Sequence, residues 1–226
     1  MRSLKSIAVI PDGNRRYAKK NGLPLPEAYA EGFQKVKSVF EWSKGAGLES
    51  ATFWALSLDN LRKRSQTELE VVLGLLGSRL DDFLSQGFDE ARINFFGRLE
   101  ELPAGLQEKF AAAEERTKEN KGFELNFAVA YGGRDDLFHA AESLARDYAS
   151  GNAELSPKEF EKRLYLSSEP DLIVRTGSAQ RLSGFLPWQN EYSELFFSEK
   201  LWPEFSRADF DEALEFYSSS ESRRGS

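Results

Sequence analysis

A single aspartate near the start of the chain lies within a cluster of positive charge. Residues 7–22 read Ile-Ala-Val-Ile-Pro-Asp-Gly-Asn-Arg-Arg-Tyr-Ala-Lys-Lys-Asn-Gly. Arginine side chains and the N–H groups at a helix start both bind anions, but Asp12 would weaken that binding unless a cation lies between. Because Mg2+ is often held by one or two carboxylates together with substrate phosphates, the stretch indicates a metal-assisted diphosphate site. The alternative is a plain turn whose aspartate only caps a helix, since no Walker or dinucleotide fingerprint is present.

A second anion-binding pattern occurs at residues 175–184, which read Arg-Thr-Gly-Ser-Ala-Gln-Arg-Leu-Ser-Gly. Two arginines among hydroxyl groups and glycines suit bidentate phosphate contacts. Ser57 and Asn60 offer neutral hydrogen-bonding groups just before the cations at 62–64. These three cations cannot all point into one site. At least one is expected on a solvated face, where Ser65 would cap the next helix.

Each of these polar clusters comes directly after a short apolar run, which is typical of a buried parallel strand. Strands are expected at 7–10, 51–56, 93–96, 125–130, 171–174 and 195–197, and helices at 27–46, 66–86, 104–121, 135–149, 156–164 and 207–218. Asn14 is the expected N-cap of the basic segment. The alternation predicts one α/β domain over residues 1–226, with about six mostly parallel strands flanked by helices. Ligands of such sheets bind outside the carboxyl ends of the strands, so the clusters should meet there.

The composition narrows the classes of function. A formal net charge of −7 disfavours nucleic acid as a partner. The absence of cysteine excludes disulfides and thiolate zinc sites, and the single histidine, His139, disfavours His-rich metal sites. Neither a signal peptide nor an apolar run of about 18 residues is visible, so a cytoplasmic protein is expected. The polar segment 218–226 is expected to be a mobile tail.

The expected helix at 66–86 has a wide apolar face. Burial in the core or in a dimer interface would explain this face. The other explanation is that the helix forms one wall of a tunnel for an apolar substrate.

Taken together, the motifs resemble the cis-prenyltransferase family, also called the undecaprenyl (polyprenyl) diphosphate synthases. The likeness covers nearly the whole chain, and its opening motif is more similar to archaeal members. No Asp-Asp-x-x-Asp motif of the trans-type synthases is present. The motifs that carry the resemblance, in order, are Pro11 to Arg16, Ala55 to Asn60, Tyr131 to Arg134, Asp171 to Arg181, Glu194 with Leu201-Trp202-Pro203, and Arg223-Arg224-Gly225.

The resemblance implies a Mg2+-dependent condensation of isopentenyl diphosphate onto an allylic diphosphate, which forms a new cis double bond. It implies catalytic roles for Asp12, as a metal ligand, and for Asn60, whose amide is a poor general base alone. Glu194 would complete the metal site, although its place at a strand's beginning does not put it beside Asp12. The allylic diphosphate would be bound by Gly13, Asn14, Arg15, Arg16, Tyr17 and Lys63, and isopentenyl diphosphate by Ser57, Arg175, Arg181, Leu182 and Ser183.

The family resemblance also implies partners. It implies a homodimer in which Arg223 and Gly225 reach the active site of the other copy. A long polyprenyl product is too apolar to leave into water, so peripheral contact with the inner face of the cell membrane is expected. Product length would depend on side chains that plug the tunnel, on helix 66–86 or at Phe95 and Phe96.

This chain departs from the family pattern at five positions. Where the family often has an Arg and a His, this chain has Leu25 and Tyr29. Leu61 replaces a Trp, Lys63 replaces an Arg, and Gln180 replaces a His. The first pair removes a cation from the expected allylic site, which leaves the allylic substrate and the product length open. Two other functions are considered: a short-chain, non-processive cis-prenyltransferase, and a non-catalytic subunit of a heteromeric enzyme. Subunits of that kind tend to lose the aspartate and arginines that this chain keeps.

Overall fold

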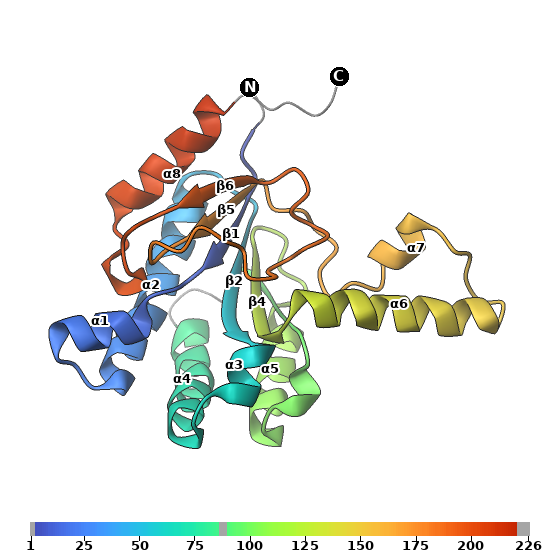
Figure 1. Cartoon of the computed structure of the whole chain (residues 1–226), viewed down its shortest axis with the longest axis horizontal. Helices are drawn as coiled ribbons and strands as arrows, with labels where there is room; N and C mark the ends of the chain where they lie inside the picture. The colour runs from blue at the N-terminus through green and yellow to red at the C-terminus, as the bar shows by residue number, and fades with distance from the viewer. Residues whose placement is uncertain (1–2, 86–89, 221–226) are drawn as a thin grey trace.

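Six strands form one parallel sheet through the centre of the computed structural model, which describes residues 3–85 and 90–220 (Figure 1). They are β1 (Ser6–Ile10), β2 (Ser50–Ser57), β3 (Arg92–Phe96), β4 (Glu124–Tyr131), β5 (Leu172–Arg175) and β6 (Glu194–Phe197). Their order is β3-β4-β2-β1-β5-β6, and every neighbouring pair is parallel. The predicted single α/β domain with a parallel sheet is confirmed.

Apolar side chains of successive strand residues enter two hydrophobic clusters on opposite faces of the sheet. In β1, Ile7 and Val9 belong to the larger cluster, whereas Ala8 and Ile10 belong to the smaller one. This split follows from the two-residue period of a strand. Because both faces are covered, β1 reads as a continuous apolar run rather than an alternating one.

Helices pack mainly on the face of the larger cluster (Figure 1). The chain forms α1 (Asn14–Asn21), α2 (Leu25–Gly45), α3 (Leu58–Lys63), α4 (Gln66–Ser85), α5 (Ala104–Thr117), α6 (Gly133–Ala149), α7 (Pro157–Glu161) and α8 (Arg207–Ser219), with 3-10 turns at Leu99–Glu101 and Trp202–Glu204. α2 starts two residues before the predicted boundary, α7 is shorter than predicted, and α3 was not predicted. Within residues 3–85 and 90–220, no helix has both the length and the apolar composition needed to cross a membrane.

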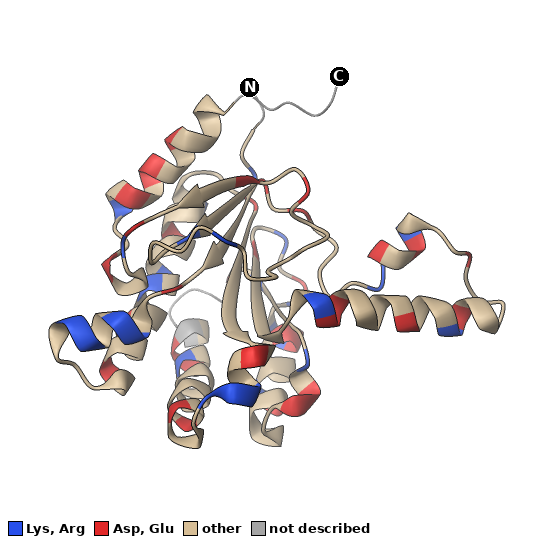
Figure 2. Cartoon of the chain, viewed as in Figure 1, with Lys and Arg blue, Asp and Glu red and all other residues tan. Residues whose placement is uncertain are grey.

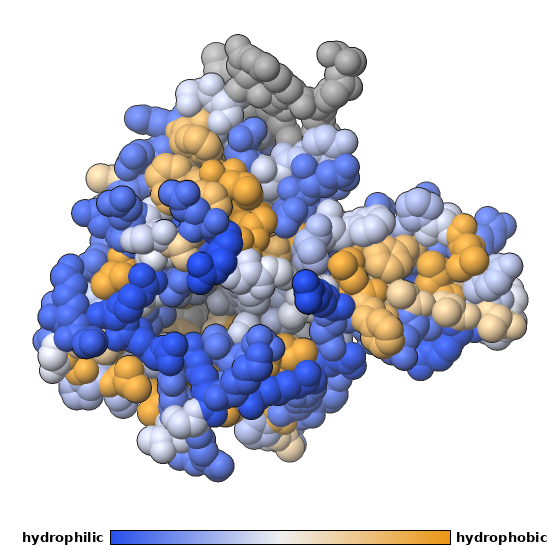
Figure 3. Space-filling view, viewed as in Figure 1, coloured by the Kyte–Doolittle hydropathy of each residue, from blue (hydrophilic) through white to orange (hydrophobic). Residues whose placement is uncertain are grey.

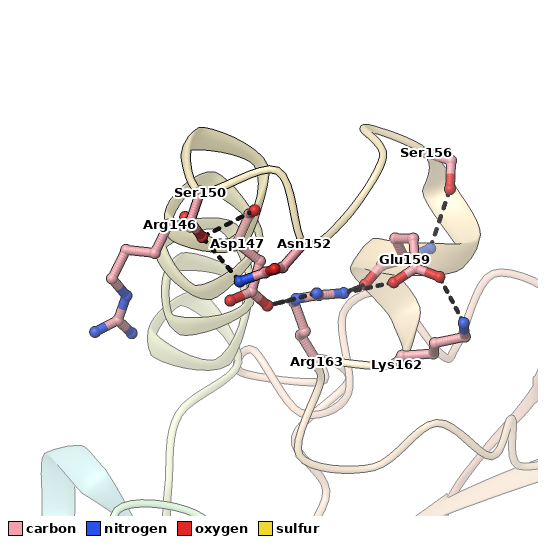
Figure 4. Close-up of polar contacts among 8 residues, drawn as sticks. All are labelled: Arg146, Asp147, Ser150, Asn152, Ser156, Glu159, Lys162 and Arg163. Atoms are coloured by element: carbon pink, nitrogen blue, oxygen red, sulfur yellow. Dashed lines mark hydrogen bonds and ion pairs between the residues drawn. The ribbon is translucent and has the colours of Figure 1, made fainter.

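The helix α6 and the short α7 form an arm that extends away from the sheet (Figure 1). Arg163 ties the two helices together, because its Nη2 lies 2.6 Å from Asp147 of α6 and its Nη1 lies 2.9 Å from Glu159 of α7 (Figure 4). Ser156 caps α7 by accepting a hydrogen bond from the Glu159 N–H. The arm is thus fixed by side-chain contacts at its far end, and it exposes large apolar residues.

The sheet reverses its winding direction between β1 and β5. From β1 the chain continues to β2 on one side, whereas β5 pairs with β1 on the other side and leads on to β6. In open α/β sheets this switch point leaves a crevice at the carboxyl ends of the strands. Asp12, after β1, and Arg175, the last residue of β5, therefore lie beside each other.

Candidate active site

A cleft of about 1600 Å³ opens at this edge of the sheet. Seven arginines and three aspartates line it, although the whole chain carries a formal net charge of −7. Lysine and arginine residues colour α1 and α3 in Figure 2, and Figure 3 shows a hollow bordered by hydrophilic residues on the same face. Local positive charge on an acidic molecule favours a small anionic ligand at this place.

The carboxylate of Asp12 lies between two arginines. Its Oδ1 is 3.1 Å from Nη2 of Arg16, and its Oδ2 accepts a hydrogen bond from Nη2 of Arg175 at 3.0 Å. The Asp12 side chain is 34% exposed, whereas Arg175 is buried. Asp12 can therefore still reach a ligand, while the Arg175 guanidinium is fixed in place at the end of β5.

The backbone after β1 is held by the segment that precedes α8 and by the loop after β5. The carbonyl oxygen of Asp12 accepts hydrogen bonds from the Thr176 hydroxyl at 2.8 Å and from the Trp202 N–H at 3.1 Å. The Trp202 indole donates to the carbonyl of Gly32 in α2, which connects the same segment to that helix. Asp12 is thus positioned by three parts of the chain that are far apart in sequence.

Gly13, not Asn14, caps helix α1. Its φ of 124° lies in a region that favours glycine, and no side chain caps the helix. Asn14 is the first helical residue, and its amide donates instead to the carbonyl of Pro11. The predicted Asn14 cap is therefore wrong. The uncapped helix start faces the cleft together with Arg15 and Arg16, as an anion site would require.

The loop after β5 builds the second polar wall. Nη1 of Arg175 donates to the carbonyl of Arg181 at 2.6 Å and to the Ser183 hydroxyl at 2.8 Å. Ser183 has a positive φ of 54°, which is uncommon outside glycine and asparagine. Arg175, Arg181 and Ser183 all line the cleft. The end of β5 therefore places the Arg175 guanidinium beside Asp12, and the loop after it adds Arg181 and Ser183 to the lining of the same cleft.

The polar residues after β2 form the short helix α3. The Ser57 hydroxyl accepts from the Asn60 N–H at 3.0 Å, which caps α3 and brings both residues into the cleft lining. Arg62 and Arg64 also line the cleft, but Lys63 is exposed and pairs with Asp59 at 2.8 Å. As expected, the three cations do not share one site.

The interior of the cleft is apolar. Phe33 and Val36 from α2, Phe53 from β2, Val72 from α4 and Phe127 from β4 line it. Val72 is the only residue among the described part of α4 that lines the cleft, so this helix contributes one position of the suggested wall. A cleft with cationic edges and an apolar interior matches a ligand with an anionic head and a hydrocarbon tail.

Several predicted residues lie outside this cleft. Phe95 stacks on Phe110 and Phe127 in the core, and Phe96 packs in the smaller cluster. The Tyr17 hydroxyl donates to Glu31, and Leu182 packs against the smaller cluster. Arg223 and Gly225 lie outside the described residues.

Glu194 does not meet Asp12 within one chain. It pairs with Leu172 at the beginning of β5, whereas Arg175 at the end of β5 is the residue beside Asp12. Three residues along a strand span roughly 10 Å. Among residues 3–85 and 90–220, no three His, Cys, Asp or Glu side chains gather as a metal cluster. Asp12 with ligand phosphates still suits Mg2+, which is often bound by a single carboxylate plus substrate oxygens.

Some residues that line the cleft were not predicted from the sequence. Arg134 and Asp135 line it from the start of α6, just after the Tyr131-Gly132-Gly133 turn. That turn follows a strand, so the signal was present in the sequence but no role was assigned to these residues. Tyr29 of α2 and Arg64 after α3 also line it. Arg64 belongs to the cation cluster at 62–64, and Tyr29 is one of the positions at which the chain departs from the family pattern, but neither was predicted to bind a ligand.

Comparison with known proteins agrees with the geometry. The family model for undecaprenyl diphosphate synthase matches residues 10–225. The isoprenyl transferase of Thermotoga maritima is 38% identical over 100% of this chain and 98% of its own. The geranylgeranyl-diphosphate-specific tritrans,polycis-undecaprenyl-diphosphate synthase of Thermoplasma acidophilum is 37% identical over 98% of this chain and 88% of its own. The crystal structure of lavandulyl diphosphate synthase from Lavandula x intermedia with dimethylallyl diphosphate superposes with a TM-score of 0.91 at 31% identity, over 96% of each chain. The chain therefore belongs to the undecaprenyl diphosphate synthase family of cis-prenyltransferases.

Proposed function

We propose that this enzyme condenses isopentenyl diphosphate onto an allylic diphosphate, with Mg2+, to make a Z-polyprenyl diphosphate that serves as a precursor of glycosyl-carrier lipids. The observation that carries the proposal is the cleft at the switch point, where Asp12 lies between Arg16 and Arg175 beside an apolar interior. Two anionic heads and one growing hydrocarbon tail need this combination of surfaces.

The two sides of the cleft suit the two substrates. On one side, the start of α1 with Gly13, Asn14, Arg15 and Arg16 would bind the allylic diphosphate. Arg175, Arg181 and Ser183 on the β5 side, with Ser57 at the end of β2, would bind isopentenyl diphosphate. The allylic carbon–oxygen bond breaks, a carbon–carbon bond forms to isopentenyl diphosphate, and one proton leaves. Asn60 would orient the group that loses this proton, and the departing pyrophosphate would accept it.

Asp12 is the proposed ligand of Mg2+. The metal, when bound, neutralises the charge that develops on the departing pyrophosphate. Arg16 and Arg175 orient the Asp12 carboxylate, and both would also donate to phosphate oxygens of the substrates. Tyr17, Lys63 and Leu182 lie outside the cleft lining, so their predicted substrate contacts need a movement of α1, α3 or the loop after β5.

A second copy of the chain is the proposed partner. The arm α6–α7 exposes Phe138, Tyr148 and Leu155, and Tyr192 and Leu195 are exposed near the edge strand β6. Orange patches mark the arm in Figure 3. Monomeric proteins rarely expose so much apolar surface on one element. In such a dimer, Glu194, Arg223 or Gly225 of one copy would reach the cleft of the other. Contact with the membrane during product release is a separate prediction.

The structural likeness to lavandulyl diphosphate synthase keeps a short-chain, non-processive enzyme as a second candidate. Product size separates the two candidates. A non-catalytic subunit is less well supported, because Asp12, Arg16, Arg175 and Arg181 are all gathered at the cleft.

The test is Mg2+-dependent incorporation of labelled isopentenyl diphosphate by wild type, Asp12→Ala and the control Asp211→Asn on α8. Asp12→Ala is expected to lower kcat by about 10²–10³-fold, the usual effect of removing one electrostatic contact at developing charge. Asp211 forms only an exposed pair with Arg207, so the control should match wild type. Full activity of Asp12→Ala would overturn the metal assignment.

A further inference from the structure

Tyr29 and Arg64, which line the cleft, form a hydrogen-bonded group with the buried Glu68. The Tyr29 hydroxyl donates to Oε1 of Glu68 at 2.7 Å, and Nη1 of Arg64 donates to the Tyr29 oxygen at 2.9 Å. Arg64 also lies 3.2 Å from Glu68, and their side chains are only 17% and 10% exposed. The group joins α2, the end of α3 and the first turn of α4.

Together with the neighbouring Arg15, the group holds two guanidinium groups and one carboxylate. Burial raises the pKa of Tyr29 to about 12, so its hydroxyl stays protonated and can donate to Glu68. Nη1 of Arg15 approaches the other oxygen of Glu68 at 3.8 Å, so one carboxylate faces two guanidinium groups. One positive charge is therefore left for a ligand.

Two of the contacts are incomplete. The Nε of Arg64 is buried and has no hydrogen-bond partner among the described residues. A buried N–H without an acceptor costs free energy, and a ligand oxygen would remove that cost. The Arg15 side chain is 66% exposed, and its distance to Glu68 is too long for a strong pair. Both arginines line the cleft, so an anion could take up donors from each.

We infer that Arg64, together with Arg15, binds the diphosphate of the allylic substrate, and that Tyr29 and Glu68 position Arg64 for this contact. The inference rests on the proposed function, in which one cleft holds two diphosphates. Arg175, Arg181 and Ser183 line the cleft at the end of β5, whereas Arg15 on α1 and Arg64 after α3 lie on either side of Glu68. Two separated groups of donors match two anionic heads.

The experiment is calorimetric binding of geranylgeranyl S-thiolodiphosphate, which does not react, to the full chain with Mg2+. Loss of one charge-assisted contact should raise the Kd of Arg64→Met about 10- to 100-fold. Tyr29→Phe should raise Kd about 3- to 10-fold, because Arg64 loses one anchor. The KM for isopentenyl diphosphate in both variants should stay within about twofold of wild type, which a general structural defect would not allow.

Two controls make the result decisive. Arg79→Met removes an exposed arginine of α4 that pairs with Asp82, and it should leave both constants unchanged. The single variant Arg64→Met leaves the buried Glu68 carboxylate without this partner, which could impair folding. The double variant Arg64→Met/Glu68→Gln removes that charge as well, and it should show the same rise in Kd. Unchanged Kd in either Arg64 variant would overturn the inference alone. A wild type that neither binds the thiolodiphosphate nor incorporates isopentenyl diphosphate would overturn the proposed function.

Discussion

The Asp12 carboxylate has a guanidinium group on each side before any ligand binds. Arg16 contacts one oxygen and Arg175 the other, and these two contacts orient the Asp12 carboxylate in the cleft. In the proposed complex, each arginine would exchange its single contact to the carboxylate for a contact to a phosphate oxygen.

The first turn of α6 carries a buried carboxyl group, that of Asp136. Asp136 is fully buried, and it accepts hydrogen bonds from the Tyr165 N–H at 2.9 Å and from the Tyr131 hydroxyl at 3.0 Å. Burial raises the pKa of Asp136 above its usual range, because the charged form is poorly solvated there. The folded protein therefore binds this proton more tightly than the unfolded chain does.

The sign of the pH effect follows from linkage. Below the ordinary pKa of an aspartate the protonated side chain contributes its full stability, and this contribution is lost as pH rises through the raised pKa. Asp136→Asn stays neutral, so wild type should lose stability relative to this variant between pH 3.8 and the raised pKa. Urea unfolding from pH 3.5 to 7 measures the difference, with Asp211→Asn as the control. A difference that does not change with pH would contradict the argument.

At the scale of elements, the loop after β5 approaches the loop after β1 so closely that a side chain does not fit between them. A Cβ at Gly177 would lie 2.4 Å from Nη2 of Arg16 and 2.9 Å from the carbonyl oxygen of Asp12. The φ of Gly177 is +83°, which other residues rarely adopt. Both the backbone angle and the space therefore require glycine there.

Gly177→Ala should destabilise the protein by about 1–3 kcal/mol, the usual cost of a strained backbone position, and should weaken diphosphate binding. Gly74→Ala is the matched control in α4, because nothing lies within 4 Å of its added Cβ. A helical Gly-to-Ala change should stabilise by about 0.5–1 kcal/mol. Chemical denaturation of both variants measures these opposite signs, and equal effects would refute the close-approach argument.

Strands with a continuous apolar run could be predicted from the sequence, and so could many of the site residues that directly follow them. Asp12, Ser57 and Arg175 each adjoin the end of a strand with a continuous apolar run, so their meeting follows from the parallel sheet. Tyr29 and Glu68 could not be found this way, because helix packing alone brings α2 and α4 together. The helix α3 was missed since six residues give no periodic signal.

At the scale of the whole molecule, the arm α6–α7 gives the chain an apolar surface outside its own core. Phe138 is 63% exposed on α6, and a buried interface between two copies would cover it. Sedimentation should therefore find a dimer of the wild type. Phe138→Glu should shift it toward monomer, since a charge in an apolar interface costs several kcal/mol. Glu142→Gln, on an exposed position of the same helix, should remain dimeric, and a monomeric wild type would contradict the assignment of the arm.

Product analysis tests most directly whether this cleft binds two diphosphate substrates and holds the growing hydrocarbon chain. Purified protein is incubated with labelled isopentenyl diphosphate, Mg2+ and, in turn, dimethylallyl, geranyl, farnesyl and geranylgeranyl diphosphate, and the products are sized. We expect isopentenyl diphosphate to be incorporated with at least one starter, and the products to form a ladder that ends at one length. The absence of incorporation with every starter would contradict it and would favour a non-catalytic subunit.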